Sequence, residues 1–210
     1  MTLHTIILGS ETDFAGWRDA ARALALANVP PEHITWTVKG RAAQLFEPTS
    51  LPPADPDRTF TVPAAFVDLA SIAILNRNPE RFARLYRLLW RLRDTPRLIE
   101  DATDPDVAIL QKFAREVRRD EHKMHAFVRF RELGRGKEAR FVAWFEPEHH
   151  IVELAAPFFA RRFADMPWSI LTPERCVHWD GRDTVFTEGA AKSDSPSSDP
   201  LEDIWRSYYA

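Results

Sequence analysis

Hydrophobic positions alternate with polar ones, or recur with helical spacing, along most of the chain. A short apolar run at 3–8 predicts a strand, and the alanine-rich segment behind it predicts a helix that ends near Asn28. Residues 34–38 predict a second strand. This strand–helix–strand opening lacks a dinucleotide-binding motif, because Gly9 and Gly16 lie too far apart.

Helical spacing dominates the middle of the chain. A proline-rich loop at 47–58 is followed by predicted helices over 63–76 and 78–93. A third helix is expected to start at the Asp-Pro-Asp segment 104–106 and to end near His125. Its apolar positions predict one buried stripe, made of Leu110, Phe113, Val117 and Met124.

The pattern then changes to alternation. Two strands, 126–133 and 139–145, are predicted around a hairpin turn at 134–137, and a helix is expected from Glu146-Pro147 to residue 163. Three more strands are predicted at 168–171, 176–179 and 183–186. The predicted fold class is α+β, a mixed, largely antiparallel sheet with several packed helices in a single domain.

The same patterns suggest a division of the chain into three parts. The α+β domain is expected to occupy 1–186 and to be followed by a flexible linker, rich in Ser, Pro, Ala and Asp, at 187–200. Residues 201–210 predict the start of a helix that leads toward a further, C-terminal domain.

Composition narrows the class of protein. With 210 residues, 45% of them hydrophobic, the chain can build one sizeable core. The single cysteine, Cys176, excludes a disulfide framework and an all-cysteine metal or iron–sulfur site within one chain. The N-terminus lacks the features of a signal peptide, and no apolar run approaches the roughly 20 residues that span a bilayer. We therefore expect a cytoplasmic protein with no membrane association.

Charge is segregated along the chain, although the formal net charge is only -3. The segment 111–140 holds ten Lys and Arg against five Asp and Glu, and 74–97 holds seven Arg against two acids. Clustered cations of this kind say more about binding partners than the total charge does.

The first cationic segment predicts an arginine face on the helix that starts at Asn78. An ordinary exposed helix mixes lysine and glutamate at spacings of four, whereas this face is almost purely arginine, the side chain best suited to phosphate. A solvated face with ion pairs to acids elsewhere in the fold is the alternative. The candidate nucleic-acid-binding residues on this face are Arg77, Arg81, Arg84, Arg87 and Arg91.

The second cationic segment continues from a helix into a predicted strand. On the strand, arginines alternate with aromatic residues, which is typical both of nucleic-acid platforms and of half-buried strands. The candidate nucleic-acid-binding residues here are Arg115, Arg118, Arg119, Lys123, Arg129 and Arg131.

Histidines near this segment suggest a different kind of site. His122 and His125 could share a helix face, and Glu146 and His149 lie close together in the sequence, so these four are candidate catalytic residues. Specific zinc-site spacings such as H-E-x-x-H are absent. We therefore expect no bound metal and no cofactor.

Several long segments resemble a bacterial domain of unknown function. They read "DPDVAILQKFAREVRRDEHKMHAFVRFRE", "ARFVAWFEPEHHIVELAAPFFARRFADMPWSILTPE" and "HWDG", and the similarity includes "ERFARLYRLLWRL" and the final "WRSYYA". The resemblance implies a DNA-repair context, because that domain occurs beside a DNA-repair radical-SAM protein or fused ahead of a uracil-DNA glycosylase of the UdgX type. The chain is similar to the fused form in its histidine-rich segments.

The chain departs from those glycosylases themselves. They carry a water-activating loop with glycine, a uracil-binding asparagine, a histidine loop and four cysteine ligands for an iron–sulfur cluster, none of which is found here. The chain alone is accordingly expected not to be an enzyme that excises uracil.

Three hypotheses follow from these observations. The first is a DNA-binding accessory domain in base-excision repair, with DNA and a uracil-DNA glycosylase domain or radical-SAM repair protein as partners. The second is a hydrolytic or lyase-type enzyme that acts on damaged DNA or nucleotides through the His/Glu site. The third is a module that docks the repair partner.

Overall fold

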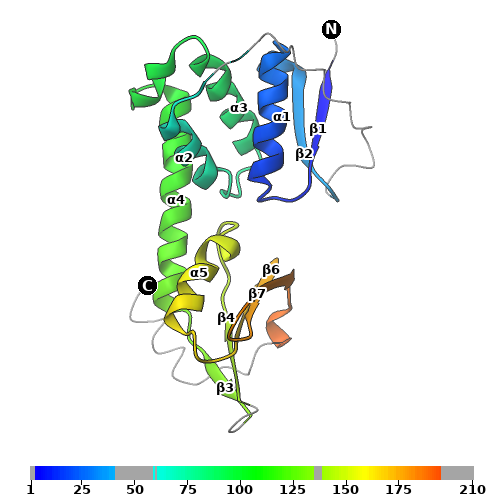
Figure 1. Cartoon of the computed structure of the whole chain (residues 1–210), viewed down its shortest axis with the longest axis vertical. Coiled ribbons are helices and arrows are strands. Elements are labelled where there is room, and N and C mark those ends of the chain that lie inside the picture. The colour runs from blue at the N-terminus through cyan, green and yellow to red at the C-terminus, as the bar shows by residue number, and fades with distance from the viewer. Residues whose placement is uncertain (1–2, 41–58, 60, 135–138, 195–210) are drawn as a thin grey trace. The chain divides into compact units, whose positions relative to one another are not determined.

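The computed structural model describes residues 3–40, 59, 61–134 and 139–194. The chain divides between Arg119 and Asp120 into two compact units (Figure 1). The predicted proline-rich loop at 47–58 and the predicted helix at 201–210 lie outside the described residues. No helix in the described ranges is both long and apolar enough to cross a membrane.

The first unit begins with the predicted strand–helix–strand, which is confirmed. It contains β1 (His4–Leu8), α1 (Phe14–Leu26), β2 (Ile34–Val38), α2 (Ala64–Ala73), α3 (Arg81–Leu92) and the first part of α4 (Pro105–Phe127). Strands β1 and β2 pair in parallel, with His4 opposite Ile34. Short 3-10 helices at Pro31–His33 and Pro96–Glu100 join longer elements.

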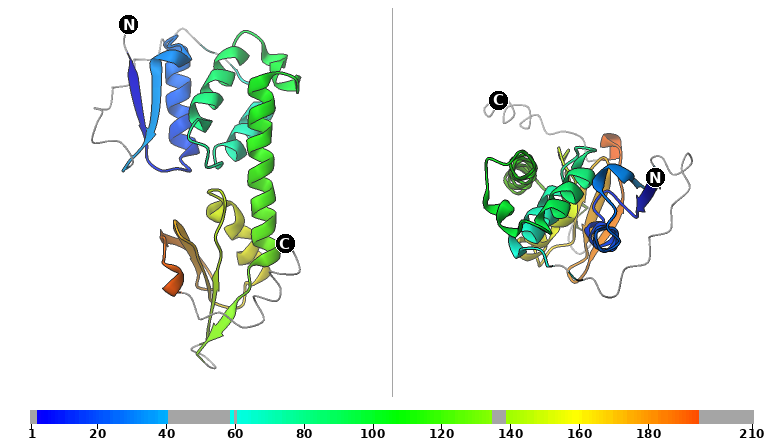
Figure 2. Two further views of the ribbon diagram at one scale, coloured as in Figure 1. Left: turned by 180° about the vertical axis from the view of Figure 1, so that it is seen from behind. Right: turned by 90° about the horizontal axis from the view of Figure 1, so that it is seen from above.

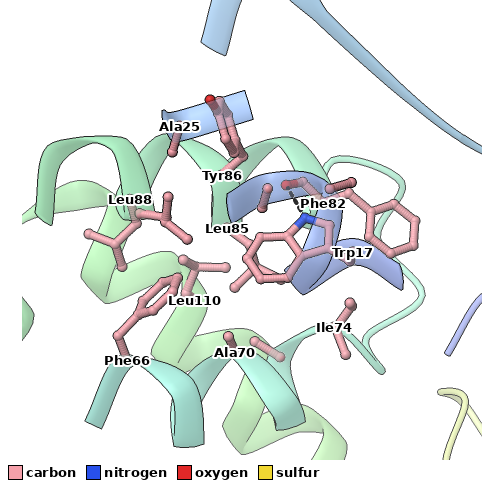
Figure 3. Packing of buried hydrophobic residues seen from close by; sticks show 14 of the residues in the cluster. Trp17, Ala25, Phe66, Ala70, Ile74, Phe82, Leu85, Tyr86, Leu88 and Leu110 are labelled. Atoms are coloured by element: carbon pink, nitrogen blue, oxygen red, sulfur yellow. Dashed lines mark hydrogen bonds between the residues drawn. The ribbon is translucent and has the colours of Figure 1, made fainter. Parts of the chain in front are cut away.

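The core of this unit lies where α1, α2, α3 and α4 meet (Figure 3). Trp17 is 1% exposed, and its indole N–H donates to the carbonyl of Phe82 at 3.3 Å. Tyr86 is fully buried, so its hydroxyl donates to the carbonyl of Val29 at 2.7 Å and burial raises the pKa of the phenol. Both polar tips are therefore satisfied inside an apolar core.

Helix α4 presents its predicted apolar stripe to the interior. Leu110, Phe113, Val117 and Met124 are all buried, which confirms the sequence prediction. Asn76 fixes the helix within the first unit, because its buried amide donates to the carbonyl of Phe113 at 3.3 Å. The opposite side of α4 is thereby left to solvent.

The second unit is a five-stranded mixed sheet with one helix packed on it. It contains the end of α4, β3 (Arg131–Leu133), β4 (Arg140–Trp144), α5 (Val152–Arg162), β5 (Trp168–Leu171), β6 (Arg175–Trp179), β7 (Thr184–Glu188) and a 3-10 turn at Lys192–Asp194. The strand order follows the sequence, and only β4 and β5 pair in parallel. The α+β class with a mixed, largely antiparallel sheet is confirmed.

Helix α5 packs on one face of this sheet through aromatic side chains. Phe159 lies 6.1 Å from Trp168 and from Phe130, measured between ring centroids. Trp168 and Ile170 share that face and are buried, whereas alternation along the strand places Ser169 on the other face. The ribbon of α5 lies beside the sheet in Figure 2. The sheet therefore has one covered side and one side turned away from α5.

The predicted strand at 126–133 starts too early. Helix α4 continues to Phe127, and pairing with β4 begins only at Arg131. The reason lies in Arg129, whose guanidinium donates to the carbonyls of Ala126 at 2.7 Å and Val128 at 3.0 Å. This arginine satisfies backbone acceptors at the end of the helix and is not a strand residue.

Two other predicted boundaries are wrong. Helix α5 begins at Val152 instead of Glu146-Pro147, because the backbone N–H of His149 donates to the Asp120 carboxylate at 2.8 Å and is held outside the helix. Strand β7 extends to Glu188, so the predicted linker at 187–200 starts too early.

Gly189 and Ala190, which follow β7 and belong to the predicted linker, pack against the turn that contains Thr172 and Pro173. A Cβ atom on Gly189 would lie 2.0 Å from the carbonyl oxygen of Pro173, so only glycine fits. The N–H of Ala190 donates to the carbonyl of Thr172 at 2.9 Å. The part of the linker from residue 195 onward lies outside the described residues.

Candidate nucleic-acid interface

The arginine face predicted on α3 is largely an internal ion-pair network. Arg91 donates two hydrogen bonds to the carboxylate of Asp104, at 3.0 Å and 2.6 Å, and a third to Asp106 at 2.7 Å. Arg87 donates to the other oxygen of Asp106 at 2.8 Å. Both acids are buried at the N-terminus of α4, where the helix dipole favours their charge, and Asp104 also accepts from the N–H of Val107.

This network is a stabilising element of the first unit. Hydrogen bonds from the Arg91 guanidinium hold the pKa of Asp104 below its usual range, and the same bonds raise the pKa of Arg91. Asp104 therefore contributes stability at neutral pH that is lost as pH falls through its lowered pKa. For Arg87 and Arg91, the structure therefore agrees with the alternative interpretation of this face, in which the arginines form ion pairs with acids elsewhere in the fold.

The remaining members of the α3 face have other surroundings. Arg81 is 1% exposed, so its predicted place on the outward, phosphate-facing side is wrong. Arg84 pairs with Glu80 one helical turn away. Arg77 is exposed, and it also takes part in an interaction within the described chain.

A cationic stripe remains on the solvent side of α4. We define it as Arg115, Arg118 and Arg119, which are all exposed. At about 100° per residue, positions i, i+3 and i+4 lie on one helix face. In the described part of the chain, none of the three side chains takes part in an ion pair or hydrogen bond. Three exposed arginines therefore share one face of α4.

Acids on α4 do not neutralise this stripe. Glu116 accepts a hydrogen bond from the amide of Asn76 at 3.0 Å, and Lys112 lies 3.9 Å from its other oxygen. Like-charged neighbours at these spacings destabilise an isolated helix by a few tenths of a kcal/mol per pair. A polyanion bound along the stripe would remove that repulsion.

The other cations of this segment are engaged within the second unit. Lys123 pairs with Glu148 at 2.6 Å, and Arg129 bonds to backbone carbonyls as described above. Arg131 is half-buried in β3 and has an interaction partner. The structure therefore does not extend the cationic stripe into the predicted strand.

Two of the four candidate catalytic residues, His125 and Glu146, make side-chain contacts within the second unit. His125 stacks on Phe158 with ring centroids 4.0 Å apart, and burial lowers the pKa of its imidazole. Glu146 accepts from the indole of Trp144 at 2.8 Å and from Lys192 at 3.1 Å. His122 is exposed. Across the described ranges, no three His, Cys, Asp or Glu residues are placed to hold a metal ion.

The backbone of His149, the fourth candidate, is held by a buried carboxylate. Asp120 is 2% exposed and accepts from the His149 N–H, and burial raises the pKa of this acid above its usual value. Since the folded state binds the proton more tightly than the unfolded chain, Asp120 costs stability as pH rises through its pKa.

We expect Asp120→Asn to be at least as stable as the wild type at pH 7, because asparagine keeps the acceptor oxygen and loses the buried charge. The difference in the free energy of unfolding between Asp120→Asn and the wild type should become smaller toward pH 4, where the wild-type carboxyl binds a proton. Urea unfolding at pH 4 to 7 measures it. A variant less stable than wild type by the same amount at every pH would contradict this role.

A polar cluster that sequence reasoning missed lies on the sheet face turned away from α5. Ser169 on β5 and His178 on β6 are paired across the antiparallel register, with Ser169 Oγ 2.8 Å from His178 Nδ1. Both are polar residues inside predicted apolar strands, and this was the feature of the sequence from which the cluster could have been found. Their contact depends on the register set by the loop between the strands, which periodicity does not give.

Comparison with known proteins adds one match. The model of a family described as a domain of unknown function, DUF4130, matches residues 79–210, more than half of the chain. No curated protein and no solved structure is significantly similar to this chain.

Proposed function

The chain belongs to the DUF4130 family, and we propose that it is a DNA-binding accessory domain in DNA repair. In this proposal the cationic stripe of α4 contacts the phosphate backbone. The partner is a uracil-DNA glycosylase domain or a radical-SAM repair protein, as the sequence resemblance implies. The chain supplies binding, and the partner supplies the repair chemistry.

The observation that carries the proposal is the contrast between the two arginine faces. Arg87 and Arg91 are paired with carboxylates, whereas Arg115, Arg118 and Arg119 are exposed and have no partner among the described residues. Guanidinium groups stay charged and donate paired hydrogen bonds that match phosphate oxygens. Three of them on one helix face span about 6 Å of helix axis, so that one bound polyanion can contact all three.

Recognition of this kind is independent of sequence. Contacts to phosphate position a protein on nucleic acid, whereas base contacts are needed to read its sequence. The stripe offers arginine and no exposed aromatic residue of its own, so we propose that it binds the backbone without a preference for bases. Specificity for a lesion would then come from the repair partner.

The test is a salt titration with fluorescent single- and double-stranded oligonucleotides. For about three neutralised phosphates, log affinity should fall against log salt with a slope of roughly -2 to -3. Arg115→Gln, Arg118→Gln and Arg119→Gln should each reduce the steepness of that slope by about one. Arg97→Gln changes an exposed arginine outside α4. It is the matched control and should leave the slope unchanged.

A salt-independent affinity, or stripe variants that match Arg97→Gln, would contradict DNA binding by α4. That outcome would favour the docking hypothesis, in which the same arginines meet acidic groups of the repair protein.

A further inference from the structure

The second unit contains a polarised hydroxyl beside a small cavity. The side chains of Ser169, His178 and Thr187 come from the neighbouring strands β5, β6 and β7 and lie on one sheet face. Ser169 Oγ lies 2.8 Å from His178 Nδ1, and His178 Nε2 lies 2.9 Å from Thr187 Oγ1. The imidazole thus connects two hydroxyls across three strands.

One tautomer of His178 is compatible with the hydrogen bonds of Thr187. Its hydroxyl donates to the carbonyl of Glu188 at 3.4 Å. A hydroxyl has one proton to donate, so Thr187 accepts the bond from His178 Nε2–H. In that tautomer Nδ1 is the acceptor, and the hydroxyl of Ser169 donates to it. This is the arrangement of a general base on a nucleophile.

The cavity supplies the space that a substrate needs. It measures about 260 Å³ and is lined by Ser169, His178, Trp179, Arg140, Pro167 and Val185, among others. Arg140 is exposed, and no ion pair or hydrogen bond of its side chain occurs in the described chain. A guanidinium that shares a cavity with a nucleophile can stabilise negative charge that develops on an attacked carbonyl oxygen.

We propose that Ser169 is a nucleophile, that His178 is its general base and that the site acts on small carboxylic esters. Ser169 Oγ forms a bond to the carbonyl carbon while its proton moves to His178 Nδ1. The carbon–oxygen bond to the alcohol breaks, and the leaving alcohol takes that proton. Water then attacks the acyl-serine, gives a proton to His178 and releases the acid, and the proton returns to Ser169.

Thr187 is a positioning residue in this proposal, because it acts through His178 and not on the substrate. Substitution by valine removes the acceptor for Nε2–H and lets the ring adopt the other tautomer. Substitution by serine keeps the acceptor. The pair Thr187→Val and Thr187→Ser therefore separates the orientation of the imidazole from the packing of the strand.

The experiment uses the whole chain with a fluorophosphonate, which reports a nucleophilic serine without the need to know the natural ester. Ser169 Oγ forms a bond to phosphorus, fluoride leaves, and the proton passes through His178 to solvent. We expect one adduct per chain by intact mass, located on Ser169 by peptide mapping, and hydrolysis of p-nitrophenyl acetate by the unlabelled protein.

Ser169→Ala should abolish both signals, and His178→Gln should slow labelling by about 100-fold or more. Thr187→Val should slow it by roughly three- to tenfold, the value of one hydrogen bond, and Thr187→Ser should restore it. Ser71→Ala, which removes an exposed serine on α2, should behave as wild type.

Absence of labelling, labelling of another residue, or an equal rate in His178→Gln would overturn the proposal. Circular dichroism and thermal unfolding show whether each variant is folded. The site uses no residue of the cationic stripe, so its failure would leave the DNA-binding proposal untouched, and the reverse holds as well.

Discussion

Arg81→Met should lower the free energy of unfolding by about 3–5 kcal/mol, the usual cost of removing one partner of a buried charge pair. Arg81 is 1% exposed, and its guanidinium donates to the carbonyls of Ile74 at 2.7 Å, Asn78 at 3.1 Å and Glu11 at 3.1 Å. It also pairs with the carboxylate of Glu11. Methionine matches its length but satisfies none of these acceptors.

Arg84→Met is the matched control for this measurement. It lies one turn further along α3 and pairs with Glu80 near the surface, so its loss should cost about 0.5 kcal/mol or less. Urea unfolding of the two variants at pH 7 compares them directly. Equal, small losses in both would contradict the buried role of Arg81.

The helices of the first unit could be predicted because their apolar periodicity is strong. The buried stripe of α4 is an example, since Leu110, Phe113 and Val117 follow helical spacing without interruption. Boundaries were less accurate where a single long-range hydrogen bond decides them. A hydrogen bond to Asp120 holds His149 outside α5, and the local sequence pattern around residue 149 does not indicate that hydrogen bond.

The arginine faces show that functional residues, too, are only partly predictable from the sequence. Sequence periodicity placed Arg87 and Arg91 on a helix face but could not reveal Asp104 and Asp106 across from them, because those acids begin another helix. It also placed Arg81 on that face, where the fold buries its side chain. Charge clustering therefore predicts where cations gather, and only tertiary structure shows which of them are neutralised.

The Ser169–His178 pair depends on strand register. Alternation identified β5 and β6 as strands, with Ser169 between apolar residues of β5 and His178 between apolar residues of β6. A shift of one residue in the pairing would turn one of the two side chains to the opposite face. The turn between β5 and β6 sets the register that brings Ser169 and His178 into contact. In this turn Thr172 Oγ1 donates to the carbonyl of Arg175 at 2.8 Å.

Simultaneous replacement of Arg115, Arg118 and Arg119 by glutamine should weaken DNA binding by about 100- to 1,000-fold, at roughly five- to tenfold per lost phosphate contact. The side chains are exposed, so the free energy of unfolding should change little. Relief of repulsion between neighbouring guanidinium groups works in the stabilising direction. A selective loss of binding in a folded protein is therefore expected.

Net charge must be controlled, because any protein that loses cations binds DNA less well. Arg22, Arg97 and Arg182 are exposed, lie outside α4, and have no ion pair among the residues that the structure describes. The triple glutamine variant at these positions loses the same three charges. Its affinity should stay within about threefold of wild type, because unspecific attraction is screened beyond roughly 10 Å at 0.1 M salt.

The decisive measurement is the affinity of wild type and these two triple variants for one double-stranded oligonucleotide, by fluorescence anisotropy between 50 and 200 mM salt. Contact between the α4 stripe and phosphates predicts a steep salt dependence for wild type and for the Arg22/Arg97/Arg182 variant, and weak binding with a nearly flat curve for the Arg115/Arg118/Arg119 variant. Equal losses of affinity in both triple variants would contradict it, since the α4 stripe would then contribute only its share of the net charge.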